Sequence, residues 1–127
     1  MQKSSTSREL KLDILMCIGE LFLQCGDFCF KHFKRAMQLI YRSCKGVFSV
    51  ADINYAEAMQ DSIIETLMCM IHGTDNMEMP ILLSENMSFI TEFVRITTEK
   101  SKKPKLEYVQ SCLMFLGDVA NLFPQER

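Results

Sequence analysis

Cys25, Cys29 and His32 are the residues whose types and spacing could do chemistry. The pattern Cys-x3-Cys-x2-His supplies thiolate and imidazole groups, which zinc prefers, but a structural zinc site needs four tetrahedral ligands. His72, the other histidine, lies far along the chain. The more economical interpretation is that the cysteines are buried thiols beside a partly exposed histidine.

Cys29 and His32 also have the i, i+3 spacing that places a nucleophile and a base on one helix face. No Asn or Asp that would orient the histidine and no oxyanion loop accompany them. Gly-rich phosphate loops, HExxH and GxSxG motifs are missing from the sequence as well. We therefore expect a protein without catalytic activity, metal or other cofactor.

The bulk properties indicate one ordinary globular domain. The 127 residues are 48% hydrophobic and 24% charged, with a net charge of −2. This charge favours neither a nucleic-acid nor an anionic-membrane partner. The sequence does not open with a signal peptide, and no stretch approaches 18 apolar residues. We interpret the six cysteines as reduced, mostly buried thiols of an intracellular protein: Cys17, Cys25, Cys29, Cys44, Cys69 and Cys112.

Hydrophobic periodicity predicts an all-α chain of five antiparallel helices. Ser7 and Asp52 are predicted N-caps, and Gly26 followed by Asp27 predicts a helix end and a new start. Residues 1–6 are expected to be a disordered end or a remnant of cloning, and 7–127 a single segment. Within it we expect a first hairpin over 7–45, a second hairpin over 52–100 and a further helix over 105–123. The predicted helices are 7–25, 28–45, 52–72, 83–100 and 105–123.

A short string recurs along the chain. Leu15-Met16-Cys17-Ile18-Gly19 is nearly repeated as Leu113-Met114-Phe115-Leu116-Gly117, and Leu67-Met68-Cys69-Met70 lies between them. Self-similarity at about 40–50 residues is typical of helical-repeat solenoids. The first, third and fifth helices are then outer A-helices in an A-B-A-B-A order, and Gly19 and Gly117 are predicted at close helix contacts.

Two helices carry charged faces of opposite sign. Glu85, Glu92 and Glu99 recur every seven residues on the fourth helix, where Arg95 can pair with the last two at i+3 and i+4. The second helix carries a basic face whose residues are Lys31, Lys34, Arg35, Arg42 and Lys45. The simplest interpretation of either face is a solvated side of an amphipathic helix.

The order of several motifs resembles the C-terminal HEAT repeats of the importin-beta family of nuclear import receptors. Leu12-Asp13-Ile14-Leu15 followed by Ile18-Gly19-Glu20 is similar to the family's A-helix pattern Q-I-L-x-x-[FI]-G-[DE]. Gly26-Asp27-Phe28 resembles its turn into the B-helix, and Leu116-Gly117-Asp118-Val119 resembles the A-helix of the next repeat. The likeness covers the chain from about Leu10 to Pro124.

The resemblance implies a HEAT-repeat α-solenoid fragment of a receptor that moves between cytoplasm and nucleus. Its implied role is non-catalytic protein binding in nuclear import. The implied partners are the importin-alpha adaptor or cargo, nucleoporins, and the GTPase Ran, which binds mainly parts of the receptor absent here. Nucleic acid and membrane insertion are not expected.

The resemblance also suggests which residues bind. Glu85, Glu92 and Glu99 suit the basic adaptor helix, whereas Lys31, Arg35 and Arg42 would repel it and suit an acidic partner. Two alternatives remain open: a HEAT scaffold of another large assembly, such as a phosphatase or vesicle-coat subunit, or an independent bundle of five helices.

Overall fold

The computed structural model describes residues 2–100 and 105–123, and this part of the chain is all-α, as predicted. In the same part, no helix is both long and apolar enough to cross a membrane. The elements are α1 (Gln2–Cys29), the 3₁₀ turn η1 (Phe30–His32), α2 (Phe33–Val47), α3 (Ile53–Gly73), α4 (Met79–Ser84), α5 (Met87–Lys100) and α6 (Leu106–Leu122).

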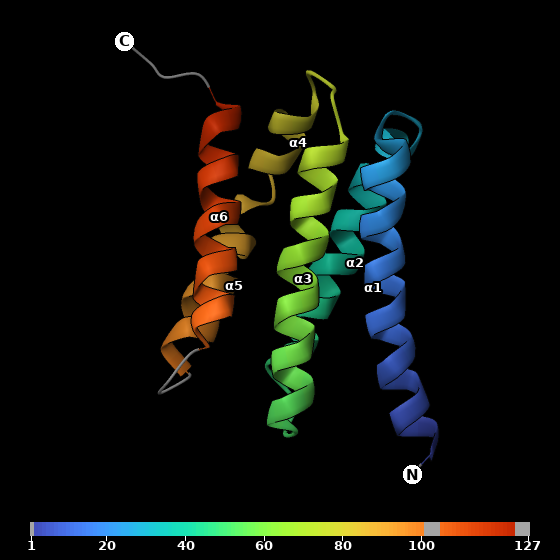
Figure 1. Ribbon diagram of the computed structural model, residues 1–127, viewed down its shortest axis with the longest axis vertical. Coiled ribbons are helices and arrows are strands. Elements are labelled where there is room, and N and C mark those ends of the chain that lie inside the picture. The colour runs from blue at the N-terminus through green and yellow to red at the C-terminus, as the bar shows by residue number, and fades with distance from the viewer. Residues whose placement is uncertain (1, 101–104, 124–127) are drawn as a thin grey trace.

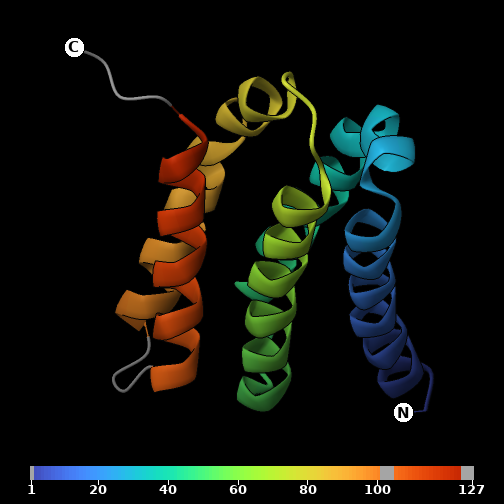
Figure 2. The same cartoon turned by 45° about the horizontal axis from the view of Figure 1, so that its top comes forward.

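The helices form two layers. Figures 1 and 2 show α1, α3 and α6 side by side in one layer, with α2 and α5 in the layer behind. α3 occupies the centre and contacts α1, α2 and α6. The predicted A-B-A-B-A order is therefore confirmed, and the short helix α4 is an addition in the connection between α3 and α5.

The core lies between the two layers and is built from aliphatic, methionine and aromatic side chains. Phe22 of α1 meets Phe33 of α2 edge-on, with ring centroids 6.1 Å apart. The hydroxyls of Thr97 in α5 and Tyr108 in α6 are 2.7 Å apart and share a buried hydrogen bond. The largest fully buried side chains include Phe33, Phe93, Phe115, Leu15, Met37, Ile40, Ile63, Ile64, Leu67, Met70, Met79 and Leu83.

α1 and α3 are in backbone contact near their C-terminal ends. A Cβ atom on Gly26 would overlap the carbonyl group of Gly73, and one on Gly73 would overlap the carbonyl group of Phe22. Seven residues nearer the N-terminus on each helix, a hydrogen bond also joins α1 and α3. The Thr66 hydroxyl donates this buried 2.9 Å bond to the carbonyl oxygen of Leu15. Only glycine allows two helices this close.

The structure breaks the first helix beside Gly26, close to its predicted end. Within α1, Cys25 has non-helical φ and ψ (−136°, 40°), so two helical stretches meet there at a kink, and the second reaches Cys29. η1 then leads directly into α2, which begins at Phe33 and not near Phe28 as predicted. No glycine in the described part has a positive φ. Gly26 is needed for its missing side chain, rather than for the left-handed conformation of a helix cap.

Other helix starts follow local signals to different degrees. Asp52 caps α3 as predicted, because its Oδ1 accepts a 3.2 Å hydrogen bond from the backbone N–H of Tyr55. α1 begins at Gln2. Residues 2–6 are therefore helical and not a disordered end as expected, and Ser7 is not the predicted N-cap. No glycine or proline precedes Ser7 to stop the helix there.

The predicted fourth helix, 83–100, starts later than expected and is preceded by the short helix α4. α4 ends at Ser84 and α5 begins only at Met87. The side-chain amide of Asn86 donates a 2.8 Å hydrogen bond to the carbonyl oxygen of Leu82. The Ser84 hydroxyl donates a 2.6 Å hydrogen bond to the carbonyl oxygen of Ile81. Such side-chain bonds compete with the regular helix pattern. The predicted connector 101–104 lies outside the described residues, and α6 matches its predicted bounds within one residue at each end.

α1 and α6 are the edges of their layer. This position corrects the expectation that most cysteines are buried and the expectation that Gly117 lies at a close helix contact. Cys17 and Cys25 are exposed, and only Cys44 and Cys112 of the six thiols are fully buried, because one side of α1 lacks a neighbour. Gly19 does face α3, where a Cβ would lie 3.4 Å from Cys69 Cβ. Nothing lies within 4 Å of the equivalent position on Gly117, so the predicted close contact there is wrong.

Alanine substitutions distinguish the glycines at the backbone contact between α1 and α3 from Gly117, which faces open space. Gly26→Ala or Gly73→Ala should lower the free energy of unfolding by about 1–3 kcal/mol, because two helix backbones must move apart. Gly117→Ala should raise it by about 0.5–1 kcal/mol through helix propensity alone. Gly19→Ala, on the same helix as Gly26, is the matched control and should be tolerated. Urea unfolding followed by circular dichroism measures all four, and equal effects would contradict the backbone contact.

The apolar side chains at the two edges should cause self-association. Phe28 on α1 is 84% exposed and Leu113 on α6 is 65% exposed. Because the two edges differ, contacts between copies should be head-to-tail and grow with concentration. Sedimentation velocity over a concentration series should show this growth. Phe28→Ser should suppress it, whereas Met77→Ser, which removes a 94% exposed side chain in the connection between α3 and α4, should not.

Candidate protein-binding surfaces

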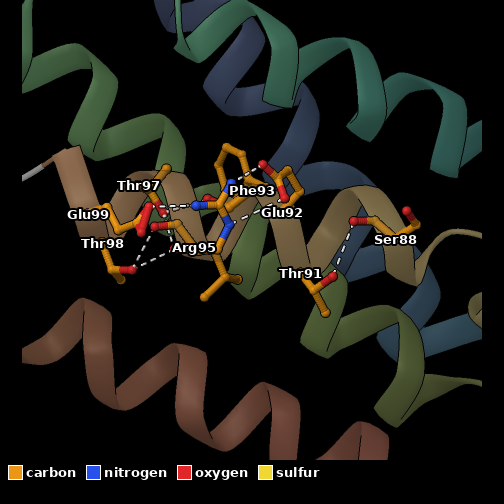
Figure 3. Close-up of polar contacts among 9 residues, drawn as sticks. Ser88, Thr91, Glu92, Phe93, Arg95, Thr97, Thr98 and Glu99 are labelled. Carbon is orange, nitrogen blue, oxygen red and sulfur yellow. Dashed lines mark hydrogen bonds and ion pairs between the residues drawn. The ribbon is translucent and has the colours of Figure 1, made fainter.

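The acidic face of α5 is largely neutralised by its own arginine. Arg95 Nη1 lies 2.7 Å from Glu99 Oε2, and the same guanidinium pairs with the carboxylate of Glu92 one turn earlier (Figure 3). The hydrogen bond and charge of Glu92, followed by the charge of Glu99, raise the pKa of Arg95. Two carboxylates and one guanidinium leave this exposed face with one net negative charge.

Glu85 does not belong to the α5 face. It follows α4, and its backbone N–H donates a 3.3 Å hydrogen bond to the carbonyl oxygen of Ile81. The break at Glu85 and Asn86 separates its position from the helix that carries Glu92 and Glu99. The structure therefore brings together two of the three predicted acidic residues.

The basic face is exposed, and its one internal contact among the described residues is Lys45 Nζ over the Tyr41 ring, 5.0 Å from the centroid. Arg35 and Arg42 lie on α2, and Lys31 lies in η1 just before it. All three side chains are exposed, and within residues 2–100 and 105–123 no carboxylate forms an ion pair with them. This face keeps its positive charge for solvent or for a partner.

An acidic cluster on α3 and α6 was not predicted. Glu57, Asp61 and Glu65 are spaced i, i+4, i+8 on α3, and Glu107 of α6 is close enough to interact with Asp61. Lys105 offsets part of this charge through a 3.3 Å ion pair with Glu57. The spacing on α3 was visible in the sequence, but the approach of Glu107 depends on the packing of α6 against α3.

The pKa of Asp61 reports the crowding of these carboxylates. Burial raises it most, and the negative charges of Glu57, Glu107 and Glu65 raise it further, while Lys105 opposes the shift. The charged form of Asp61 is therefore less favourable in the folded chain than in the unfolded chain. Such a cluster would attract positive charge.

The cysteines and histidines do not assemble into a site. Cys25 is exposed at the kink, the Cys29 thiol lies 3.6 Å from the carbonyl oxygen of Leu21, and His32 is exposed. His72 instead pairs with Asp118, at 2.7 Å between Nε2 and Oδ2, and joins α3 to α6. Across the described residues, no three His, Cys, Asp or Glu side chains are grouped to hold a metal ion.

Three thiols are also poor nucleophiles. Burial raises the pKa of Cys44 to about 12. It also raises the pKa of Cys69 and of Cys112. Since the thiolate is the reactive form, these groups are less reactive than free cysteine at neutral pH. The exposed charged faces, rather than these thiols, are the features suited to recognition.

Replacing Asp61 tests the acidic cluster. Because the folded-state pKa is raised, the unfavourable contribution of Asp61 is fully present above that pKa and disappears below the unfolded value near 3.8. Asp61→Asn should therefore raise stability at pH 7 by less than about 1 kcal/mol, with the gain shrinking as the pH falls towards 4. Thermal unfolding across this pH range measures the effect. Asp13→Asn, an exposed carboxylate on α1, is the control, and an equal gain there would refute the crowding.

Comparison with known proteins identifies the repeat. The family model described as "Importin subunit beta-1-like, TPR repeats" matches residues 1–127. Neither the curated proteins nor the solved structures gave a match. TPR and HEAT repeats are both stacked helical hairpins, which agrees with the two-layer arrangement of α1 to α6. The chain therefore belongs to the importin subunit beta-1-like family of helical repeats.

Proposed function

We propose that this chain is a non-catalytic, protein-binding segment of a nuclear import receptor that contributes to binding of the importin-alpha adaptor or of cargo. The family match over residues 1–127 is the observation that carries this proposal. A layered helical repeat suits the role, because stacked hairpins present long continuous surfaces to a partner. The exposed charged faces of α2 and α5 would supply such surfaces here.

The two charged faces would bind partners of opposite charge. Glu92 and Glu99 on α5 would attract the basic adaptor helix, with Arg95 competing for the same carboxylates. Lys31 and Arg35 would repel that helix and favour acidic parts of cargo. Nucleoporins and Ran are further partners of such a receptor, which would move between cytoplasm and nucleus. Ran would bind mainly through other parts of it.

Removing Arg95 gives a direct test of the α5 face. Arg95→Gln frees both carboxylates and should strengthen binding of a basic adaptor-helix peptide by about two- to fivefold. Glu92→Gln combined with Glu99→Gln should weaken it by a similar factor. Both effects should diminish at high salt, because exposed charges are screened. Fluorescence anisotropy with a labelled peptide measures the affinities.

Glu85→Gln is the matched control, since it removes one carboxylate outside the α5 helix and should leave the affinity unchanged. Circular dichroism confirms that each variant is folded. If the double Glu→Gln variant binds the basic peptide as tightly as the unmodified protein does, the assignment of adaptor binding to α5 is refuted.

A further inference from the structure

An open groove of about 320 Å³ lies where the first half of α1 meets the last turns of α2 and the start of α3. The buried side chains of Leu15, Val47 and Met59 form part of its lining. Ile14, which is 42% exposed, adds apolar surface at its edge. A cavity of about 150 Å³ with such walls can hold a benzene ring. The groove therefore has room for two apolar groups of that size.

The charged residues that line the groove are both positive. Lys11 comes from α1 and Arg42 from α2. Both side chains are exposed, and no ion pair joins either to a carboxylate in the part of the chain that the structure describes. The groove thus combines an apolar interior with two unpaired cations at its opening.

The neighbouring carboxylate, Asp52, is already engaged. Arg8 Nη1 lies 3.2 Å from Asp52 Oδ2, while Asp52 Oδ1 accepts the capping hydrogen bond from the N–H of Tyr55. The Arg8 guanidinium also lies over the ring of Tyr55, 5.0 Å from its centroid, and Tyr55 lines the groove. Asp52 is therefore committed to α1 and α3 and leaves the charges of Lys11 and Arg42 uncompensated.

Gly46 lines the groove and carries no side chain. It lies in the last turn of α2, and a Cβ atom at this position would meet nothing within 4 Å. A side chain at this position would therefore begin in open space next to the groove lining. Gly46 provides a way to close the groove without changing any charge.

We propose that this groove binds an acidic peptide segment of a partner protein. An apolar side chain of the peptide enters between α1, α2 and α3, and flanking carboxylates pair with Lys11 and Arg42. The buried anchor supplies affinity, and the charge-assisted bonds orient the peptide and exclude basic segments. Neither Glu92 nor Glu99 lines the groove, so this site is separate from the α5 face and has the opposite charge preference.

Three labelled twelve-residue peptides test the proposal. The first is rich in aspartate and glutamate around a central leucine–phenylalanine pair. The second has serines in place of that pair, and the third has lysines in place of the acids. Fluorescence anisotropy should show binding of the first peptide, at least tenfold weaker binding of the second and none of the third. The affinity for the first peptide should fall as salt is raised.

Variants of the protein locate the binding. Lys11→Gln and Arg42→Gln should each weaken binding of the acidic peptide by about two- to fivefold, the range for one exposed ion pair. Gly46→Leu should weaken it by about tenfold or more, because it fills the space for the anchor. Lys34→Gln is the matched control, because Lys34 is an exposed cation near the start of α2 that does not line the groove. It should leave the affinity unchanged.

The result for Gly46→Leu decides the proposal. If that variant is folded by circular dichroism and binds the acidic peptide as tightly as the unmodified protein, the groove is not the site. Equal binding of the serine peptide, or equal weakening by Lys34→Gln, would reduce the interaction to non-specific charge attraction and also overturn the proposal. Gly46→Leu should not change binding of the basic adaptor-helix peptide, so failure here is distinguishable from failure of the α5 assignment.

Discussion

The close contact between the backbones of α1 and α3 is the constraint on which the rest of the structure depends. Gly26 and Gly73 allow two helices to approach without side chains between them, and the hydrogen bond from Thr66 to Leu15 fixes their register. α3 in turn supports α2 behind it and α6 beside it. The groove near the starts of the same two helices is bounded by this arrangement.

Charge pairing decides which faces of the molecule can attract a partner. On α5, the i+3 and i+4 spacing lets Arg95 satisfy Glu92 and Glu99 within a single helix (Figure 3). On α2, acids are absent at the corresponding spacings, so the positive charge of Arg35 and Arg42 is not offset. The chain therefore has faces of different net charge, which favours recognition of partners by electrostatic complementarity.

Local signals in the sequence predicted most of the helices correctly. Asp52 is an N-cap because its carboxylate reaches a backbone N–H three residues on, and the period of apolar residues located α6 within one residue at each end. The predicted break beside Gly26 is present, but the prediction failed at the start of α2, which lies at Phe33 because η1 precedes it. It failed again at Asn86, whose side chain bonds a carbonyl oxygen and separates Glu85 from the α5 face.

The sequence by itself determined the all-α class, the basic face of α2 and the pairing of Glu92 and Glu99 with Arg95, because each depends on residues within a few turns of one another. Tertiary structure alone decided that Gly26 and Gly73 lie at a backbone contact while Gly117 faces open space. It also placed Lys11 and Arg42 around one groove. These relations join residues far apart in the chain, and only the packing of helices against one another brings them together.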